Sequence, residues 1–149
     1  MLVYRIALAK YANKLVASGR AARWNPNDVD MIYTASSRSL ACLENVVHRN
    51  QLGLNLAFNV MTIEVPDNLK ITTINLNTLK PDWSNFNQMR FTQTIGENWI
   101  KEQKTAILAV PSSIIEEEFN YLLNPKHQDF GAIKLIRSVP FVFDQRIKQ

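Results

Sequence analysis

The chain has 149 residues, of which 46% are hydrophobic and 20% are charged, and its formal net charge is +4 at pH 7. This length and composition are those of one globular domain with a real core, so we expect a single domain over residues 1–149. No apolar run approaches the roughly 18 residues that cross a membrane, and the N-terminus lacks the pattern of a signal peptide. We therefore expect a cytoplasmic protein without membrane contact.

The rarity of cysteine and histidine excludes further classes of protein. Cys42 is the only cysteine, so the chain has no internal disulfide and no cysteine-based zinc site, and the two histidines lie far apart in sequence. Lys and Arg are scattered, without runs of four and without interleaved aromatic residues. This arrangement argues against direct nucleic-acid binding, whereas the positive balance suits an anionic small ligand or an acidic partner.

The first elements predicted are a strand at residues 2–8 and a short helix at residues 9–19, which ends at Gly19. Residues 20–30 form a polar loop with an Asn-Pro turn signal. A short run of β-branched and aromatic residues then predicts a strand at residues 31–35.

The middle of the chain predicts a helix followed by two strands. The helix covers residues 37–49, with Ser36 or Ser37 as its N-cap. The strands cover residues 56–65, which alternate as a half-buried strand does, and residues 70–76.

The last part predicts a helix over residues 81–103 that begins at a proline, then an apolar strand at residues 105–110. Residues 116–125 have the pattern of a short helix or turn, and residues 132–143 that of one or two closing strands. Strands predominate and helices do not alternate with them regularly. The sequence therefore predicts an α+β fold and argues against a doubly wound parallel sheet.

The helix at residues 37–49 carries a carboxylate where an apolar residue is expected. At about 100° per residue, Leu40, Leu43 and Val47 fall on one side, and Glu44 falls among them. An ionised carboxylate taken out of water costs several kcal/mol unless it is paired or hydrogen-bonded. Glu44 therefore has either a structural partner or a use in a cavity. Its candidate partners are Arg20, Arg23 and His48.

Polar residues next to predicted strand ends are the candidates for chemistry, because the four isolated glycines cannot build a phosphate-binding loop. Arg23 precedes the second strand, Tyr33 lies in that strand and Glu44 on the following helix. Ser112 and Ser113 follow an apolar strand.

These candidates also have structural interpretations. Arg23 is then a surface arginine and Trp24 beside it a core residue. Tyr33 is a strand tyrosine with a satisfied hydroxyl, and Ser112 caps a turn. The residues by themselves leave both interpretations open.

Four blocks, in order and over nearly the whole chain, resemble the RES-domain toxins, a bacterial family encoded beside helix-turn-helix antitoxins. One block alone is weak, but four at the right spacing are specific. The blocks are VYRI at residues 3–6; Arg-Trp-Asn, Tyr-x-Ala-x-Ser and Ala-x-Leu-Glu-x-x-x-His within residues 22–48; Gly-x-x-Trp and Val-Pro-Ser within residues 96–112; and Asn-Pro-x-His with Phe-Asp-x-Arg within residues 124–146.

The resemblance implies a mixed β-sheet core with flanking helices, similar to the fold of ADP-ribosyltransferases. It implies the toxin of a RES/Xre-type toxin–antitoxin system, which arrests growth by cleaving the nicotinamide–ribose bond of NAD, by hydrolysis or phosphorolysis. Some members instead transfer ADP-ribose to a protein. It further implies an Xre-type helix-turn-helix antitoxin that blocks the cleft within a hetero-oligomer. NAD enters as the substrate, and we expect no cofactor and no metal.

Transferred to this sequence, the family's catalytic set is Arg23, Tyr33, Glu44 and Ser112. Arginine binds diphosphate oxygens in bidentate fashion, and a carboxylate counters the positive charge that develops on the ribose. The residues expected to contact the substrate are Arg20, Arg23, Trp24, Tyr33 and Ser112.

One departure from the family pattern concerns the residues before Arg23. Ala21 and Ala22 stand where many relatives have Gly-Gly, and alanine disfavours positive φ and a close approach of the backbone to phosphate. Charge from Arg20 would compensate.

Two functions remain as alternatives to NAD cleavage: ADP-ribosylation of a protein target, and a non-catalytic binding module, for example for nucleic acid.

Overall fold

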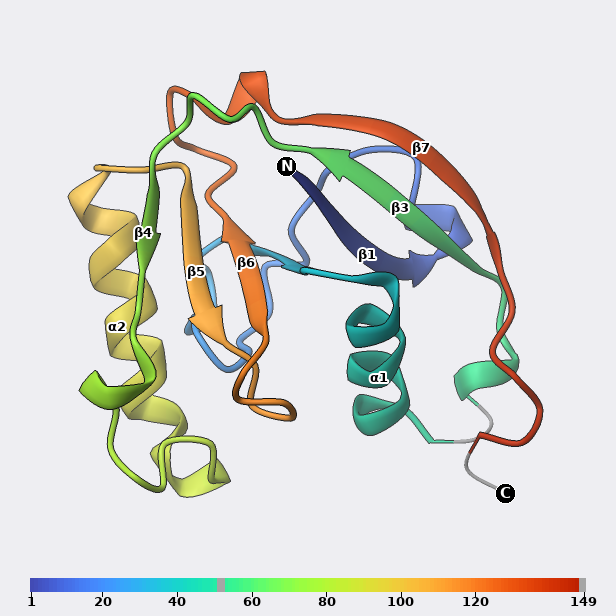
Figure 1. Ribbon diagram of the computed structural model, residues 1–149, viewed down its shortest axis with the longest axis horizontal. Helices are drawn as coiled ribbons and strands as arrows, with labels where there is room; N and C mark the ends of the chain where they lie inside the picture. The colour runs from blue at the N-terminus through green and yellow to red at the C-terminus, as the bar shows by residue number, and fades with distance from the viewer. Residues whose placement is uncertain (51–52, 148–149) are drawn as a thin grey trace.

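The computed structural model describes residues 1–50 and 53–147, and within them seven strands form one mixed sheet. The order across the sheet is β4-β5-β6-β2-β1-β3-β7 (Figure 1), with β4 and β5 parallel and the other neighbours antiparallel. The predicted α+β class is confirmed. The elements are β1 Leu2–Leu8, β2 Ile32–Ala35, α1 Arg38–His48, β3 Phe58–Glu64, β4 Ile71–Thr73, α2 Met89–Glu102, β5 Ile107–Pro111, β6 Phe119–Leu123 and β7 Lys134–Phe141.

The sheet is nearly divided between β1 and β2. Among the described residues these neighbours share one pair, Tyr4 with Ala35, whereas β1 pairs with β3 at seven positions and β2 with β6 at four. In Figure 1, β4, β5 and β6 stand on one side and β1, β3 and β7 on the other, with α1 below β1. The edge of β1 beyond Tyr4 therefore has no strand partner on the β2 side.

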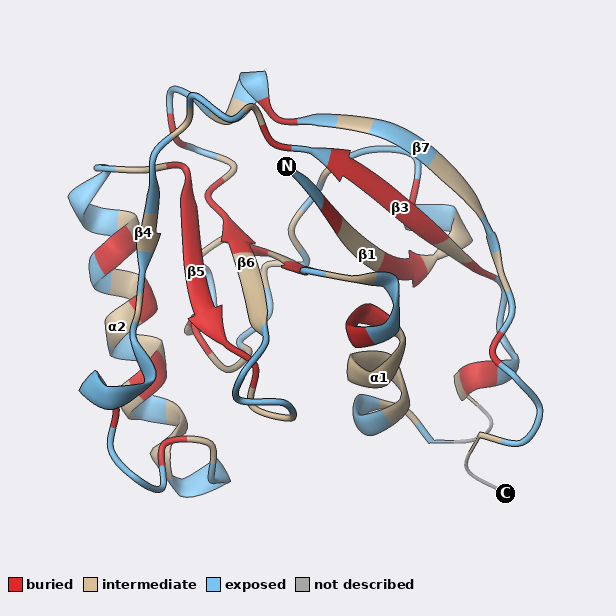
Figure 2. Ribbon diagram, in the orientation of Figure 1, coloured by how far each residue is buried: buried red, intermediate tan, exposed pale blue. Residues whose placement is uncertain are grey.

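Each helix packs on one part of this divided sheet. α1 packs Leu40 and Ala41 in one cluster with Ile6 of β1 and Phe58 of β3. α2 packs Trp99 in a second cluster with buried residues of β5 and β6. Figure 2 shows β5 and most of β3 buried, whereas β7 at the sheet edge is largely exposed. No helix in residues 1–50 and 53–147 has the length and apolarity needed to cross a bilayer.

Some predicted elements agree closely with the structure. The first strand has the predicted bounds, and the strand at residues 31–35 is β2. The helix at residues 37–49 is α1, whose N-cap is Ser37, because its side chain accepts a hydrogen bond from the amide of Leu40. The strands predicted at residues 56–65 and 105–110 are β3 and β5.

The predicted helix at residues 9–19 is wrong. Only Ala9–Tyr11 form a 3-10 turn, and the chain then runs on without helix. Ala12 is buried, and Leu15 and Ala17 pack on a core cluster that includes residues of β1, β2 and β3. A helix this short is marginal by itself, so burial of these apolar side chains decides the conformation.

Two other predicted elements also need correction. Residues 116–125 were expected as a helix or turn, but β6 occupies the centre of the sheet between β5 and β2. Pairing on both sides outweighs the helical preference of the glutamates, which stay in the preceding loop. The helix expected to begin at Pro81 begins instead at Met89, after a series of turns and the 3-10 turn Phe86–Gln88.

The loop before β2 is fastened to α2, in addition to its own internal hydrogen bonds. The hydroxyl of Thr92 donates a hydrogen bond to the carbonyl oxygen of Arg23, and the side-chain amide of Gln93 donates to that of Ala22 at 2.9 Å. Both acceptors lie about 70 residues earlier in the chain. α2 thereby fixes the position of a loop that carries one of the predicted site residues.

We predict that Gly96→Ala destabilises the protein by about 1–3 kcal/mol or more. A Cβ at Gly96 would lie 1.7 Å from the carbonyl oxygen of Trp24, so α2 and the loop would have to separate. Urea denaturation measures the change. Gly131→Ala is the matched control, because a Cβ there meets nothing within 4 Å. Equal free energies of unfolding for the two variants would contradict this contact.

Candidate active site

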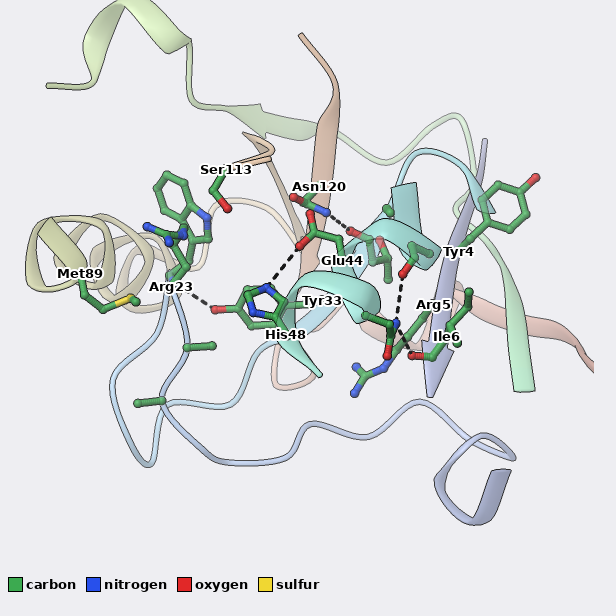
Figure 3. Close-up of a pocket in the computed structure, with 17 residues that line it drawn as sticks. Tyr4, Arg5, Ile6, Arg23, Tyr33, Glu44, His48, Met89, Ser113 and Asn120 are labelled. Atoms are coloured by element: carbon green, nitrogen blue, oxygen red, sulfur yellow. Dashed lines mark hydrogen bonds and ion pairs between the residues drawn. The ribbon is translucent and has the colours of Figure 1, made fainter. Parts of the chain in front are cut away.

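A cavity of about 460 Å³ lies along the edge of β1 that β2 leaves. Tyr4, Arg5 and Ile6 are consecutive in β1 and all line it. Neighbouring side chains of a strand point to opposite faces of the sheet, so these three residues cannot all line the cavity from one face. The cavity therefore borders the edge of β1. Residues 33–35 of β2, one side of α1 and the loop at residues 21–24 complete most of the lining (Figure 3).

Glu44 lies on the side of α1 that faces the cavity, with 22% of its side chain exposed. The apolar stripe expected around it is only partly present, because Leu40 is buried whereas Val47 is 52% exposed. Cys42 and Val46 instead pack on the cluster beneath α1. The core-facing side of α1 is therefore rotated relative to the prediction, and Glu44 faces the cavity, not the core.

Both carboxylate oxygens of Glu44 have partners. Ser112 donates a hydrogen bond from Oγ to Oε1 at 3.3 Å, and Nε2 of His48, one helical turn away, lies 3.5 Å from Oε2. Of the three residues predicted as partners of Glu44, His48 is the one within ion-pair distance of its carboxylate. The imidazole is 65% exposed, so it meets the carboxylate from the solvent side. The two contacts fix the orientation of the carboxylate.

Ser112 lies behind Glu44 and does not line the cavity, because it is fully buried at the end of β5. Its Oγ accepts hydrogen bonds from the amides of Ile114 and Ile115, at 3.1 and 3.2 Å. Ser112 thus caps the turn after β5 and holds Glu44 at the same time. The next residue, Ser113, is the serine that lines the cavity.

Arg23 enters the cavity from the loop that α2 fastens. Its guanidinium carbon lies 5.9 Å from the centre of the Trp83 ring, and its Nη1 is buried without a hydrogen-bond partner among the described residues. Burial lowers the pKa of the Arg23 guanidinium, and the negative charge of Glu44 acts in the opposite direction. A buried donor without an acceptor costs stability.

Tyr33 lines the cavity with its ring, while its hydroxyl organises the loop. The hydroxyl accepts a hydrogen bond from the amide of Trp24 at 3.0 Å and donates to Oδ1 of Asn25 at 2.5 Å. Asn25 in turn donates from Nδ2 to the carbonyl oxygens of Arg20, Pro26 and Val29. Burial raises the pKa of the Tyr33 phenol above its usual value, which keeps the phenol neutral.

Ala21 and Ala22 both line the cavity, and neither has a positive φ. Alanine therefore fits the loop without strain. Their amides are used within the loop: that of Ala21 donates to Oδ1 of Asn27, and that of Ala22 to the carbonyl oxygen of Asn25, both at 2.9 Å. These two amides are therefore not free for a phosphate.

The structure brings four of the predicted site residues to the cavity: Arg23, Trp24, Tyr33 and Glu44. Trp24 is only 2% exposed and packs on Trp83, with ring centres 5.7 Å apart, so it also belongs to the core. Arg20 is exposed and does not line the cavity, and Ser112 reaches it only through Glu44.

Arg5 is the charged cavity residue that the predicted site set omits. No hydrogen bond or ion pair to its guanidinium is present among the described residues. Burial lowers its pKa, and in Figure 3 its side chain extends from β1 toward the side where Tyr33 and His48 lie. An arginine within an apolar strand is the same kind of sequence signal as Glu44 in α1. Applied to β1, this signal would have identified Arg5 as a candidate site residue.

Other titratable residues lie elsewhere or have structural roles. His127 is buried, contacts the carbonyl oxygen of Gln103 at 2.9 Å and accepts a hydrogen bond from the amide of Asp129, so it anchors its loop. Burial raises the pKa of the Cys42 thiol, which disfavours the reactive thiolate. In the described part of the chain, no cluster of three His, Cys, Asp or Glu residues suits a metal ion.

A family model described as the RES domain matches residues 2–144. The chain belongs to the RES domain family. Proteins named Toxin Res are similar over almost the whole chain: that of Yersinia enterocolitica is 32% identical, covering 99% of this chain and 100% of the relative, and that of Photorhabdus laumondii is 33% identical, covering 99% and 97%. The membership predicted from the four sequence blocks is confirmed.

Two further comparisons concern a curated relative and a solved structure. A protein named Prs ADP-ribosylating toxin, from a Sphingobium species, is 40% identical over 84% of this chain and 79% of its own length. The crystal structure of the Mycobacterium tuberculosis MbcT–MbcA toxin–antitoxin complex contains a chain with the same fold. The TM-score is 0.78 at 19% identity, over 95% of this chain and 84% of that one.

We predict that Tyr33→Phe costs about 1–3 kcal/mol at pH 8, because the amide of Trp24 and Oδ1 of Asn25 lose their shared partner. The folded state holds the Tyr33 pKa above that of the unfolded state, near 10. As the pH rises above about 10, ionisation in the unfolded chain therefore weakens the wild type but not the variant.

Urea denaturation at pH 8 and at pH 10.5 tests this expectation. The difference in free energy of unfolding between the wild type and Tyr33→Phe should shrink at the higher pH. A difference that stays constant or grows would show that the phenol ionises as freely in the folded protein as in the unfolded chain.

Proposed function

We propose that this protein cleaves the bond between nicotinamide and ribose in NAD, and that it thereby arrests growth as the toxin of a toxin–antitoxin pair. The observation that carries the proposal is a cavity in which the carboxylate of Glu44 lies, in the view of Figure 3, between Arg23 and Arg5. NAD combines a diphosphate, which guanidinium groups bind, with a sugar carbon that becomes cationic during cleavage.

Two arginines without a full set of partners support a diphosphate in the cavity. Arg23 has a buried Nη1 without an acceptor, and Arg5 has no ion pair within the described residues. The amides of Ala21 and Ala22 in the loop are already used. The diphosphate oxygens therefore take the acceptor positions that the protein leaves open. The cavity volume, about 460 Å³, lies within the range of small-molecule sites.

Glu44 supplies the electrostatics of bond cleavage. The bond between C1′ of the ribose and the ring nitrogen breaks, and its electron pair leaves with nicotinamide, which becomes neutral. The ribose carbon becomes an oxocarbenium ion, and the fixed carboxylate of Glu44 stabilises it and accepts hydrogen bonds from the ribose hydroxyls. Water or phosphate then bonds to C1′ and releases a proton. No general acid is needed, because the leaving ring is already cationic.

Fixed charge is more effective than mobile charge, because no reorganisation is needed in the transition state. Ser112 and His48 give Glu44 that fixed orientation, with one contact to each oxygen. The Tyr33 ring offers a flat surface for nicotinamide, and its neutral hydroxyl holds the loop of Arg23 in place. In this assignment Ser112 acts through Glu44, and Arg20 contributes only distant charge.

An antitoxin that covers the cavity completes the proposal. The M. tuberculosis structure is that of a toxin–antitoxin complex, and it contains a chain with the same fold as this one. The family's sequence blocks imply an Xre-type helix-turn-helix partner in a hetero-oligomer. An antitoxin that covers the cavity would keep NAD out until the antitoxin is removed.

ADP-ribosylation of a protein is the second candidate, favoured by the name of the Sphingobium relative, Prs ADP-ribosylating toxin. The same bond breaks, and a side chain of the target replaces water as the acceptor of C1′. Incubation with NAD labelled in its adenine half separates the two reactions. Label on a protein band favours transfer, and label in free ADP-ribose or its phosphate ester favours NAD cleavage.

The protein, freed of antitoxin, is expected to release nicotinamide from NAD, measured by chromatography with and without phosphate. Glu44→Gln should lower the rate on the order of 100-fold or more, because the charge that stabilises the ribose cation is lost. Its free energy of unfolding should change by no more than about 1 kcal/mol, since the carboxylate is partly exposed.

Glu97→Gln is the control for Glu44→Gln, because Glu97 pairs with Lys101 across one turn on a partly exposed face of α2, away from the cavity. It should leave the rate unchanged. If the wild type released no nicotinamide in both buffers, with and without phosphate, this result would contradict the proposal.

Arg5→Ala should raise the KM for NAD on the order of 10- to 100-fold, because a charge-assisted hydrogen bond to phosphate is lost. Since burial of this unpaired cation costs stability, the free energy of unfolding should not fall. Arg137→Ala, an exposed arginine on the far edge strand β7, is the control for a general loss of positive charge. Equal KM values for both variants would exclude Arg5 as a phosphate ligand.

A further inference from the structure

The parting of β1 and β2 leaves a backbone carbonyl of β1 that no strand can satisfy. The amide of Ala9 donates to Ala57 and the amide of Val65 donates to Met1, so the odd-numbered residues of β1 bond to β3. The even-numbered residues then face β2. Within the described residues, the single bridge between the two strands is at Tyr4, and at Ile6, two residues further on, β2 no longer pairs with β1.

The side chain of Asn45 in α1 makes the hydrogen bond to Ile6 that a paired strand would otherwise make. Its Nδ2 donates to the carbonyl oxygen of Ile6 at 3.2 Å and to that of Ala41 at 3.0 Å. Its Oδ1 accepts from Nε of Arg49 at 3.1 Å, and the Arg49 guanidinium lies 4.9 Å from the centre of the Phe58 ring in β3. Both amide hydrogens and the amide oxygen are used, so Asn45, although it lines the cavity, offers no free donor to a ligand.

This one amide joins the neighbours of two charged cavity residues. Asn45 follows Glu44 directly in α1, and Ile6 follows Arg5 directly in β1. A shift of α1 along the edge of β1 would therefore change the separation between the Glu44 carboxylate and the Arg5 guanidinium. Ser112 and His48 orient the carboxylate, but neither contacts β1 through a hydrogen bond.

We propose that Asn45 is a positioning residue, which holds α1 against the open edge of β1 so that Glu44 and Arg5 engage the ribose and the diphosphate of one NAD molecule. The inference rests on the proposed function for its substrate. It assigns to one side chain the hydrogen bond that supplements the apolar packing of α1 on β1. Asn45 thereby acts on the reaction through Glu44 and Arg5, without touching the substrate.

The test compares Asn45→Ala with Asn59→Ala in the full chain. Asn59 donates from Nδ2 to Oγ of Ser138 at 3.0 Å, between β3 and β7, and it does not line the cavity. Both variants lose a side-chain hydrogen bond to another element, but only the first loses the hydrogen bond from α1 to β1. Alanine is a strong helix former, so α1 itself persists. Steady-state rates of nicotinamide release are measured well below the melting temperature of each variant.

Asn45→Ala should lower kcat/KM on the order of 10- to 100-fold, because small misplacements of the reacting groups are costly, whereas Asn59→Ala leaves it unchanged. In an Arg5→Ala background the loss caused by Asn45→Ala should be at least about threefold smaller, since the distance it sets no longer matters. Equal losses in both backgrounds, or equal losses for the two asparagine variants, overturn the proposal.

Growth arrest on induced expression separates this inference from the proposed function. A wild type that arrests growth without releasing nicotinamide overturns NAD cleavage. The growth readout then decides on Asn45 alone: relief of arrest by Asn45→Ala and not by Asn59→Ala supports the positioning role, and arrest that persists with both variants overturns it.

Discussion

β1 and β2 share one bridge, between Tyr4 and Ala35, and the architecture of the site follows from their separation beyond it. A continuous ladder would satisfy the edge of β1 and leave no space beside it. Because β2 departs, the edge of β1 faces a cavity, and α1 comes close enough to contribute a carboxylate. The backbone carbonyl that this leaves unpaired at Ile6 is satisfied by an asparagine of that same helix.

The groups around the cavity divide into those that are satisfied and those that are not. The side chains of Tyr33, Asn25 and Ser112 and the amides of Ala21, Ala22 and Trp24 have protein partners, so they hold the framework rigid. Nη1 of Arg23 lacks a partner in the described residues, and burial disfavours the charge of both Arg23 and Arg5. Such groups reduce stability, and we propose that a ligand provides their partners, in accordance with a trade-off between stability and function.

Local sequence signals were sufficient for several elements and for part of the site. The strand-forming runs of β1 and β3 and the Ser37 cap of α1 are local, and the structure has these elements. The misplaced charge of Glu44 indicated either a structural partner or a cavity, and the structure has both. The family blocks added Arg23 and Tyr33, which the structure places in the same cavity as Glu44.

What the sequence could not provide depends on contacts between distant segments. β6 is a strand because β5 and β2 pair with it on both sides, against the preference of its own neighbourhood. The loop of Arg23 is fixed by Thr92 and Gln93, which no local pattern connects to it. Ser112 was expected beside the substrate, yet its full burial behind Glu44 follows only from the packing of the β5 end. The rotation of α1, which exposes Val47, likewise depends on its fit to β1 and β3.

The central claim is that the gap beside β1 is an NAD site with Glu44 at the reacting bond. A crystal structure of the Glu44→Gln variant with NAD tests it most directly, because the substrate then stays intact. The account predicts the diphosphate in contact with Arg5 and Arg23, and C1′ of the nicotinamide ribose facing the substituted side chain at position 44. NAD bound elsewhere, or bound in the cavity with its nicotinamide ribose away from position 44, would contradict it.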